Sequence, residues 1–175
     1  MRKSLIYLLF IAIALVFVSC ESGETGPPHD KSLDSLNIEA EKIKVSDLLD
    51  RLAEATEAGN IEAIENIWCP EPHSLLLGTE NGEKLVGWKQ IKQAITGQST
   101  SFKDMLIAIT DQNIQLDRDG RTAWFFEELN YSFILDNKAM SFEGIRFTGV
   151  FVKSNLDEWK LVQGHMSVAS PLDLD

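Results

Sequence analysis

Four long runs of strand-forming residues follow Phe102 and fill most of the C-terminal half of the chain. Short turn signals separate them, with "DRDG", "DNKA" and "SNLD" between successive runs. Runs joined by such short turns must pair as antiparallel neighbours, because parallel strands need a much longer crossover. The sequence therefore predicts an antiparallel sheet with strands at 105–116, 122–135, 140–153 and 158–170.

The residues before this sheet, from Ile38, follow a helical pattern. Apolar side chains recur at the spacing of one helix face, at Val45, Leu48, Leu49, Leu52 and Ala55. Gly59 follows where a helix end needs positive φ, and Asn60 is placed to cap a second, short helix. A short strand is predicted at "SLLLG" and a third helix at "GWKQIKQAI". Helices followed by long antiparallel strands predict an α+β domain, with the helices on one face of the sheet.

Both faces of the predicted sheet are rich in apolar residues. An antiparallel sheet with one wet face alternates regularly between apolar and polar residues, and these strands do not. The helices can cover only one face, so a second copy of the chain is the simplest cover for the other. We therefore predict a homodimer packed sheet against sheet.

The turns also give an expected register for the last three strands. A two- or four-residue connection at "DNKA" is expected to set Leu135 opposite Met140, and a loop at Ser154–Asp157 is expected to set Lys153 opposite Glu158. A change of one residue in either loop would exchange the two faces of a strand.

The N-terminal residues predict an export signal. A short basic start precedes an apolar run from Leu5 to Val18, which is too short to span a bilayer and is typical of a secretory signal core. The following "FVSC" resembles the bacterial lipobox, in which a signal peptidase cuts before the cysteine and a diacylglycerol is attached to it. We expect residues 1–19 to be a lipoprotein signal peptide and Cys20 to be lipidated. Ordinary secretion with cleavage nearby is the alternative.

Residues 20–36 are rich in Gly, Pro, Ser and charged residues, which predicts a flexible tether. The folded domain is then expected at 37–171, with a tail at 172–175. The net charge of −11 opposes contact with nucleic-acid backbones and with anionic membrane surfaces. We therefore expect no nucleic-acid partner and a location in the bacterial cell envelope, where the lipid anchors the protein to a membrane on its non-cytoplasmic side.

Three stretches resemble a known domain family. "GNIEAIENIWCPEPHSLLLGTENGEKLVGWKQIKQAI" resembles the first half of a SnoaL-like domain, and "DGRTAWFFEELNYSF" and "RFTGVFVKSNLDEWKLVQGHMS" resemble the second half. The resemblance covers roughly 38–170. It implies the cystatin-like fold of nuclear transport factor 2, a cone of curved sheet closed by helices around a pocket, often dimeric through the outer side. This superfamily holds isomerases, cyclases, dehydratases and members without chemistry, so the fold does not settle function.

One subgroup of that superfamily, which resembles the association domain of calmodulin-dependent kinase, shares the last strand with its "W…H.H.S" pattern. Its pocket arginines correspond to Phe126, Gly149 and Met166 here, so a pocket for small anions of that type is not expected. The same correspondence implies that Phe126 and Met166 point inward and that His165 points outward, toward the partner.

These considerations define two groups of expected site residues. The expected pocket residues are Trp124, Phe126, Glu128, Asn130, Phe147 and Met166. The expected dimer-interface residues are Tyr131, Arg146, Trp159 and His165.

Glu128 and His165 are the candidate catalytic residues. Among aromatic neighbours, Glu128 would lose solvation and its pKa would rise, which suits an acid–base role; a solvated place at the pocket mouth is the alternative. The expected register sets Arg146 opposite His165, with Glu127 on the diagonal. His165 would then be either a general base near neutral pH or, as we favour, a structural imidazole held by neighbours across the interface.

No cofactor or metal is expected. Cys69, Glu71 and His73 lie across two prolines without a second cluster, and no glycine-rich phosphate loop is present in the sequence.

The expected function is that of an envelope-anchored lipoprotein that binds a small, largely apolar molecule and does no chemistry on it. One alternative is an isomerase or lyase that uses Glu128 as its acid or base. The other is a dimerisation or interaction module whose pocket is filled by its own aromatic side chains. An open cavity with a perturbed Glu128 favours chemistry, an open dry cavity favours binding, and a filled one favours the interaction module.

Overall fold

The structure is a computed structural model that describes residues 31–79 and 82–169. The expected signal peptide 1–19, the expected lipidation site Cys20 and the expected tail 172–175 lie outside these ranges. Among the described residues, no helix is long and apolar enough to cross a membrane.

The described residues form helices first and then a long-stranded sheet, so the predicted α+β class is confirmed. The helices are α1 (Lys31–Glu57), α2 (Ile61–Ile67) and α3 (Trp88–Ser101). The strands are β1 (Leu75–Leu77), β2 (Lys84–Val86), β3 (Lys103–Leu116), β4 (Thr122–Leu135), β5 (Lys138–Lys153) and β6 (Trp159–Ser167). The four long strands lie where they were predicted, with ends that differ by at most three residues.

Helix α1 begins at Lys31, inside the segment that was expected to be tether. The last glycine and proline of that segment are Gly26 and Pro28, so no helix breaker stands between Lys31 and the helix end. Residues 31–36 are therefore helical. At the other end, Gly59 has φ +62 and the side chain of Asn60 accepts a hydrogen bond from the Ala63 N–H at 3.1 Å, as the sequence predicts.

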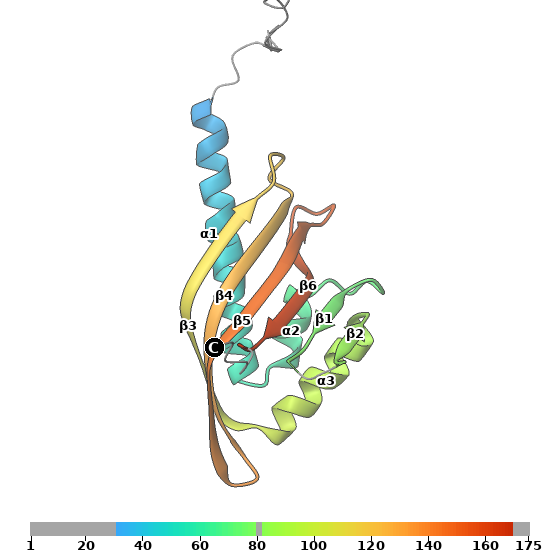
Figure 1. Cartoon of the computed structure of the whole chain (residues 1–175). Helices are drawn as coiled ribbons and strands as arrows, with labels where there is room; N and C mark the ends of the chain where they lie inside the picture. The colour runs from blue at the N-terminus through green and yellow to red at the C-terminus, as the bar shows by residue number, and fades with distance from the viewer. Residues whose placement is uncertain (1–30, 80–81, 170–175) are drawn as a thin grey trace, which may run out of the picture. The chain divides into compact units, whose positions relative to one another are not determined.

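The six strands make one sheet in the order β2-β1-β6-β5-β4-β3. Figure 1 shows that the long strands are strongly curved and that α1 runs along one side of them. Strand β1 is antiparallel to β2 and parallel to β6. Strand β2, which was not predicted, is only three residues long and is defined by its pairing with β1.

The register between β4 and β5 differs from the prediction. Asp136 and Asn137, with φ +50 and +62, form a tight two-residue turn, so Leu135 pairs with Lys138 and not with Met140. Further along, an extra residue on β5 makes a bulge at Gly144, whose φ is +67. The positive φ suits a glycine, and the Gly144 N–H donates to Asn130 Oδ1 at 3.0 Å.

A second bulge shifts the register between β5 and β6. Val150 pairs with Gln163, but the next residue of β5 pairs with Leu161, so Val162 is the extra residue. Lys153 pairs with Trp159 and not with Glu158, because Glu158 belongs to the connection, where its carbonyl accepts a hydrogen bond from the Ser154 N–H at 2.8 Å.

The two bulges decide which side chains face the helices. We call the face covered by the helices the inner face and the opposite one the outer face. Buried inner-face residues are Ala123, Phe125, Glu127, Leu129, Tyr131 and Phe133 from β4, Ile145, Phe147 and Phe151 from β5, and Trp159 and Leu161 from β6. The outer face carries Trp124, Phe126, Glu128 and Asn130 from β4, Arg146, Thr148, Val150 and Val152 from β5, and Gln163, His165 and Ser167 from β6.

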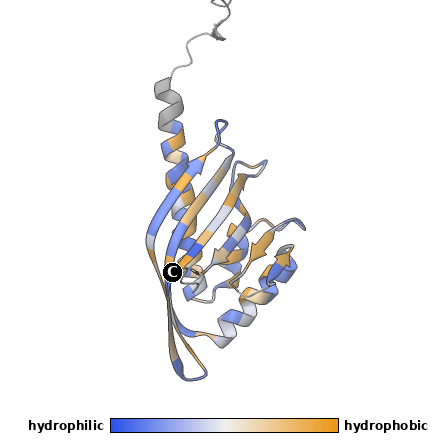
Figure 2. Cartoon of the chain, in the orientation of Figure 1, coloured by the Kyte–Doolittle hydropathy of each residue, from blue (hydrophilic) through white to orange (hydrophobic). Residues whose placement is uncertain are grey.

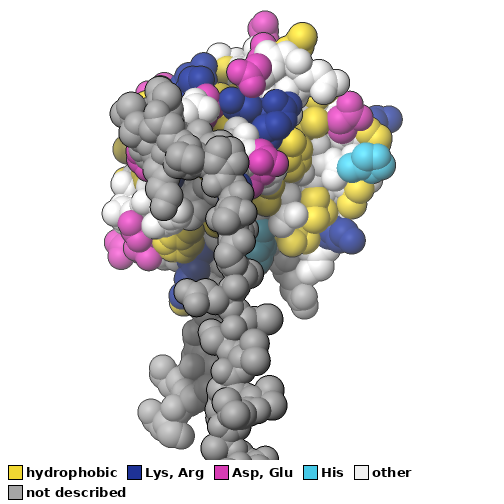
Figure 3. Space-filling model, turned by 90° about the horizontal axis from the view of Figure 1, so that it is seen from above, with side chains coloured by type: hydrophobic (Ala, Val, Ile, Leu, Met, Phe, Trp, Pro, Cys, Tyr) yellow, Lys and Arg dark blue, Asp and Glu magenta, His cyan; other side chains and the backbone are white. Residues whose placement is uncertain are grey.

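Each bulge breaks the alternation of a strand, so the inner face gathers more apolar residues than a regular strand would give it. Figure 2 shows polar and apolar residues mixed along the long strands. The outer face is accordingly more polar than predicted, although Trp124 remains 48% exposed there. In the view of Figure 3, hydrophobic side chains lie among acidic and basic ones on the surface.

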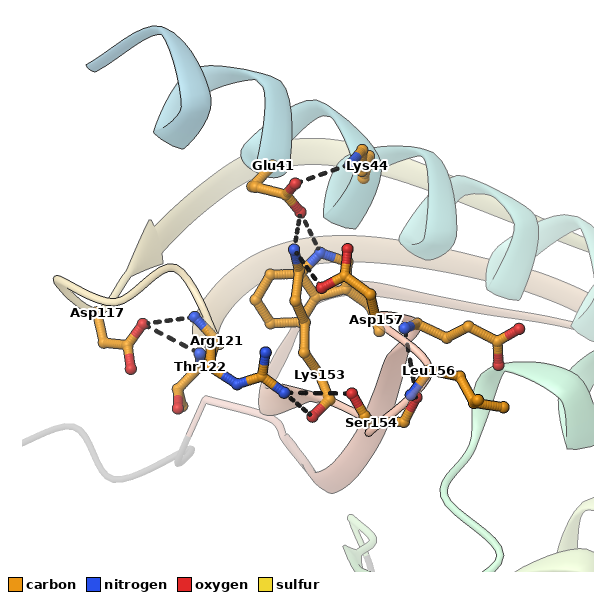
Figure 4. Close-up of polar contacts among 11 residues, drawn as sticks. Glu41, Lys44, Asp117, Arg121, Thr122, Lys153, Ser154, Leu156 and Asp157 are labelled. Carbon is orange, nitrogen blue, oxygen red and sulfur yellow. Dashed lines mark hydrogen bonds and ion pairs between the residues drawn. The ribbon is translucent and has the colours of Figure 1, made fainter. Parts of the chain in front are cut away.

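A buried ion cluster fastens α1 to the ends of β5 and β6 (Figure 4). The Glu41 carboxylate is only 4% exposed and accepts hydrogen bonds from Lys44 (2.7 Å) and from Trp159 Nε1 (2.8 Å). Lys153 Nζ lies 2.9 Å from the same carboxylate. Burial alone would raise the pKa of Glu41, but these three donors outweigh it and lower the pKa to about 2.

Candidate cavity between the helices and the sheet

A cavity of about 790 Å³ lies between the inner face of the sheet and the helices. Its apolar wall is built from Leu49, Leu52, Trp68, Leu76, Leu85, Ile95, Phe102, Ile107, Leu129, Phe133, Leu135, Met140, Phe142, Ile145, Phe147 and Met166. Such a space, apolar and with few polar groups, is the usual form of a small-molecule site.

The cavity has a closed end and an open end along β4. Alternate residues of this strand line it, and their exposed fraction rises from 2% at Glu127 to 3% at Leu129, 7% at Tyr131 and 8% at Phe133. The exposed members of the wall are Thr79, Phe142, Glu143, Val168 and Ala169, which mark the open end. Glu127 therefore lies at the closed end.

Glu127 is the polar group at the closed end. Gln112 Nε2 donates to Glu127 Oε1 at 2.9 Å, and Ser46 Oγ donates to the Gln112 oxygen at 2.7 Å. Burial raises the pKa of Glu127 to about 6, against the hydrogen bond from Gln112 and with help from the negative charge of Asp50. The carboxyl group thus changes its charge close to neutral pH.

Tyr131 lies on the same wall, two inner-face positions further toward the open end. The two residues are about 13 Å apart along the strand at 3.3 Å per residue. Burial, and then the negative charge of Glu127, raise the pKa of Tyr131 well above its ordinary range, so the phenol stays neutral and can donate a hydrogen bond.

The structure places the four β4 residues of the expected pocket on the outer face, so this part of the prediction is wrong. Trp124, Phe126, Glu128 and Asn130 do not line the cavity. The reason is the bulge at Gly144, which changes which β4 residues share a face with the inner residues of β5. Glu128 instead accepts a hydrogen bond from Thr110 Oγ1 at 3.2 Å on the outer side.

Phe147 and Met166 do line the cavity, where they were expected. They pair with each other across β5 and β6.

The four expected interface residues divide between the two faces. Arg146 and His165 lie on the outer face, but Tyr131 and Trp159 are buried on the inner face, so their expected place in an interface is wrong. For Trp159 the cause is the bulge at Val162. Because β6 has an extra residue there, Trp159 lies on the inner face although His165, six residues later, lies on the outer face.

The expected surroundings of His165 are also wrong. Its strand neighbours are Thr148 on β5 and Leu77 on β1, whereas Arg146 pairs with Ser167 and Glu127 lies on the other side of the sheet. His165 does not line the cavity, so this position gives no support to a general base acting inside it.

Glu127 was not named as a site residue from the sequence, although a signal for it exists. Every second residue from Phe125 to Phe133 is apolar except Glu127, which makes it a single carboxylate in an apolar stripe. The neighbouring stripe, with Glu128, contains more polar residues and is the solvent-facing one.

A metal site is not evident in residues 31–79 and 82–169, where no group of three His, Cys, Asp or Glu side chains is arranged to hold an ion. Cys69 is a half-buried free thiol in this part of the chain.

The sequence profile of the SnoaL-like domain matches residues 45–171 of the chain. No curated protein matches the chain significantly. A nuclear transport factor 2-like superfamily protein from Salmonella enterica serovar Typhimurium has a similar solved structure, with a TM-score of 0.71, 13% identity, and coverage of 78% of this chain and 96% of that chain.

Two further solved structures are similar. A candidate scytalone dehydratase from Novosphingobium aromaticivorans has a TM-score of 0.68 and 10% identity, over 79% of this chain and 89% of that chain. A protein with a cystatin-like fold from Caulobacter vibrioides has a TM-score of 0.62 and 17% identity, over 75% of this chain and 92% of that chain. At these identities the likeness establishes the fold and leaves the chemistry to the site itself.

Proposed function

The chain belongs to the SnoaL-like domain family, and we propose that its domain binds a small, mostly apolar molecule in the cavity. The observation that carries the proposal is the form of the cavity, with about 790 Å³ of space, an apolar wall and a single carboxylate at the closed end. Aromatic side chains line this space without filling it. That counts against the alternative of an interaction module with a filled pocket.

Binding of a neutral fluorescent probe, N-phenyl-1-naphthylamine, tests the proposal. Ala94 on α3 is half-buried and lines the cavity, so Ala94→Trp reduces the available space. Gln93→Trp, at the exposed neighbouring position of the same helix, adds the same side chain outside the cavity. We expect the wild-type protein and Gln93→Trp to bind the probe and Ala94→Trp to bind it at least tenfold more weakly. Equal binding by all three proteins, or no binding by any, contradicts the proposal.

A second candidate function is proton-transfer chemistry of the isomerase or lyase type. It is favoured by the position of Glu127, a buried carboxyl group on the cavity wall whose pKa is raised to about 6. Glu127 takes the role expected of Glu128, as the base that removes a proton from carbon next to a carbonyl group. The solved structure from Novosphingobium aromaticivorans, described as a candidate dehydratase, has a similar fold.

Exchange of carbon-bound protons separates this function from binding alone. A cyclic aromatic ketone such as 2-tetralone is incubated with the protein in D₂O, and loss of its proton signals is followed by NMR. Catalysis predicts faster exchange with the wild-type protein and with Glu128→Gln, and the uncatalysed rate with Glu127→Gln. The uncatalysed rate with all three proteins, for a ketone that binds, leaves binding as the function.

We also propose that the protein is a lipoprotein of the bacterial cell envelope, held to a membrane through Cys20. The support is the basic start, the apolar run and the "FVSC" stretch of the sequence. Metabolic labelling with a palmitate analogue tests it, since Cys20→Ser should remove the label and leave the precursor uncleaved. Cleavage at another position without label would favour ordinary secretion.

A homodimer through the outer face of the sheet completes the proposal. Trp124 and Val152, which are 48% and 37% exposed, lie on this face and support it.

A further inference from the structure

We infer that the cavity takes an apolar amine in its protonated form, with the ammonium group paired to Glu127 at the closed end. This inference rests on the proposed binding function and specifies the class of ligand.

The charges along the cavity wall have one sign. Glu83, Glu127 and Glu143 line it, and none of the described wall residues is a lysine, arginine or histidine. An anionic ligand would enter a negative field with no partner, and the net charge of −11 adds to the repulsion. A cation or a neutral molecule is therefore the ligand that the wall accepts.

Glu127 has an oxygen to offer to a ligand. Gln112 occupies Oε1, and Oε2 has no hydrogen-bond partner among the described residues. Among the described residues, every fully buried side-chain oxygen or nitrogen has a hydrogen-bond partner. Because Oε2 has none, it is not fully buried, and the space beside it is the cavity that Glu127 lines.

The residues behind Glu127 prepare it to accept hydrogen bonds. Ser46 donates to the Gln112 oxygen, which turns the amide nitrogen of Gln112 toward the carboxylate. The neighbour therefore donates to Glu127 and does not compete as an acceptor. A buried carboxylate with one neutral donor is poorly stabilised, and an ammonium group would supply both the countercharge and further donors.

Aromatic side chains provide a second attraction for a cation. Phe147 pairs with Glu127 directly across β4 and β5, and it belongs to the cavity wall together with Trp68 and Tyr131. The negative faces of aromatic rings attract alkylammonium groups, and their surfaces suit an apolar ligand body. Carboxylate and aromatic wall together favour a cationic head on an apolar skeleton over a neutral molecule of the same shape.

Three probes with one skeleton test the inference by titration calorimetry at about pH 7.5. They are 2-naphthylmethylamine, 2-naphthylmethanol and 2-naphthoate, which differ in charge and little in shape. We expect the amine to bind at least tenfold more tightly than the alcohol and the naphthoate to show no binding. Glu127→Gln should bring the affinity for the amine down to that for the alcohol, whereas Glu128→Gln, on the outer face, should keep the difference.

The pH dependence of binding gives a second test of the ion pair between the amine and Glu127. Lowering the pH from about 7.5 to 5 should weaken amine binding at least tenfold without changing alcohol binding, because Glu127 takes up a proton while the amine stays charged. The other titratable groups near Glu127 are Asp50 on α1 and Tyr131 on β4. The Tyr131 phenol stays neutral over this pH range, and the neighbours of Glu127 on β3 and β5, Gln112 and Phe147, carry no titratable group. An equal fall with Glu127→Gln would assign the effect to another group than Glu127 and overturn the inference.

The possible results separate the two levels of the proposal. If none of the probes binds, the proposed binding function fails and the inference with it. If the alcohol or the naphthoate binds as tightly as the amine, the cavity is a binding site but the amine assignment is wrong. A preference for the amine that survives in Glu127→Gln also overturns the assignment, since the cation would then be recognised elsewhere.

Discussion

Two consecutive glutamates with opposite surroundings show how strongly a single residue of β4 depends on its face. Glu127 is 2% exposed at the closed end of the cavity, whereas Glu128 is half-buried on the outer face beside Arg146 of β5. The same functional group is thus desolvated at one position and reached by water at the next. Of these two residues, only Glu127 can act in the cavity as an acid, a base or an ion-pairing partner.

Glu127 should make the stability of the fold fall as the pH rises from about 4.5 to 6. Its pKa rises from 4.5 to about 6 on folding, so the folded state favours the protonated form. This stabilisation is complete below pH 4.5, the pKa in the unfolded chain, and is lost as the pH rises through about 6, the pKa in the folded state. Glu127→Gln, which is neutral throughout, should be more stable than the wild type by roughly 2 kcal/mol at pH 7 and nearly equal at pH 4.

Urea denaturation across this pH range measures the difference between the two proteins. Glu128→Gln serves as the matched control, because it removes a charge from the adjacent residue and leaves Glu127 in place. A wild type and a Glu127→Gln variant with parallel stability curves would show that the carboxyl group is solvated in the folded state.

At the scale of secondary structure, the bulge at Gly144 sets the boundary between two halves of the β5 strand. Met140 and Phe142 line the cavity before the bulge, and Ile145 and Phe147 line it after the bulge. Phe142 and Ile145 are three residues apart, a spacing that would put them on opposite faces of a regular strand. The extra residue lets both halves turn apolar side chains inward.

Gly144→Ala should destabilise the domain by about 1–2 kcal/mol. The residue has φ +67, which costs an alanine about this much, while no atom lies within 4 Å of the added Cβ, so the cost is conformational. Gly97→Ala is the control, since it lies in α3 with open space around it and should stabilise the helix by up to about 1 kcal/mol. Thermal and urea unfolding of both variants measure these changes. Equal stability of Gly144→Ala and the wild type would contradict the bulge.

Helix α1 is fastened to the sheet by Glu41, and this contact gives a pH dependence of opposite sign. The pKa of Glu41 falls from 4.5 to about 2 on folding, so the ionised Glu41 stabilises the fold above pH 4.5. This stabilisation is lost as the pH falls toward 2. Glu41→Gln leaves the Lys153 ammonium, with a side chain 8% exposed, paired among the described residues with the solvent-exposed Asp157 alone, at 3.3 Å. We expect a loss of about 3 kcal/mol at pH 7 that disappears near pH 2.

Glu39→Gln provides the comparison within the same helix. Glu39 pairs with Lys42 at 3.0 Å, but its side chain is 69% exposed, so its removal should cost less than about 0.5 kcal/mol. Acid unfolding followed by circular dichroism distinguishes the two variants. Similar losses in both would mean that the cluster in Figure 4 is screened by water.

The elements could be predicted from the sequence because their signals are local. The apolar spacing of α1, the cap at Asn60 and the turns between the long strands each involve neighbouring residues, and each is found where it was expected. The faces of the strands could not be predicted, because they depend on the bulges at Gly144 and Val162. A bulge adds one residue without a strong local signal, and one residue is enough to turn a strand over. The choice of Glu128 in place of Glu127 follows from this.

At the scale of the whole molecule, the outer face of the sheet still lacks a cover within the described chain. The helices lie on the inner face, and the outer face keeps Trp124 and Val152 exposed, with Phe126 and Val150 half-buried beside them. The bulges moved Tyr131 and Trp159 away from this face, so the expected apolar area is smaller than the sequence suggested. A dimer built on it would join two chains of net charge −11, whose repulsion weakens as salt screens it.

We therefore expect a homodimer that becomes tighter with ionic strength and that depends on Trp124. Light scattering coupled to size exclusion should give twice the chain mass for the wild type, and Trp124→Glu should give the mass of one chain, because it places a charge at the centre of the apolar cluster. Leu156→Glu, at an 81% exposed position in the turn before β6, should remain a dimer. A dimer that persists in Trp124→Glu would place the interface elsewhere. A wild type with the mass of one chain at high salt would mean that the outer face is a solvated surface, polar enough with Glu128, Arg146 and Gln163 to need no partner.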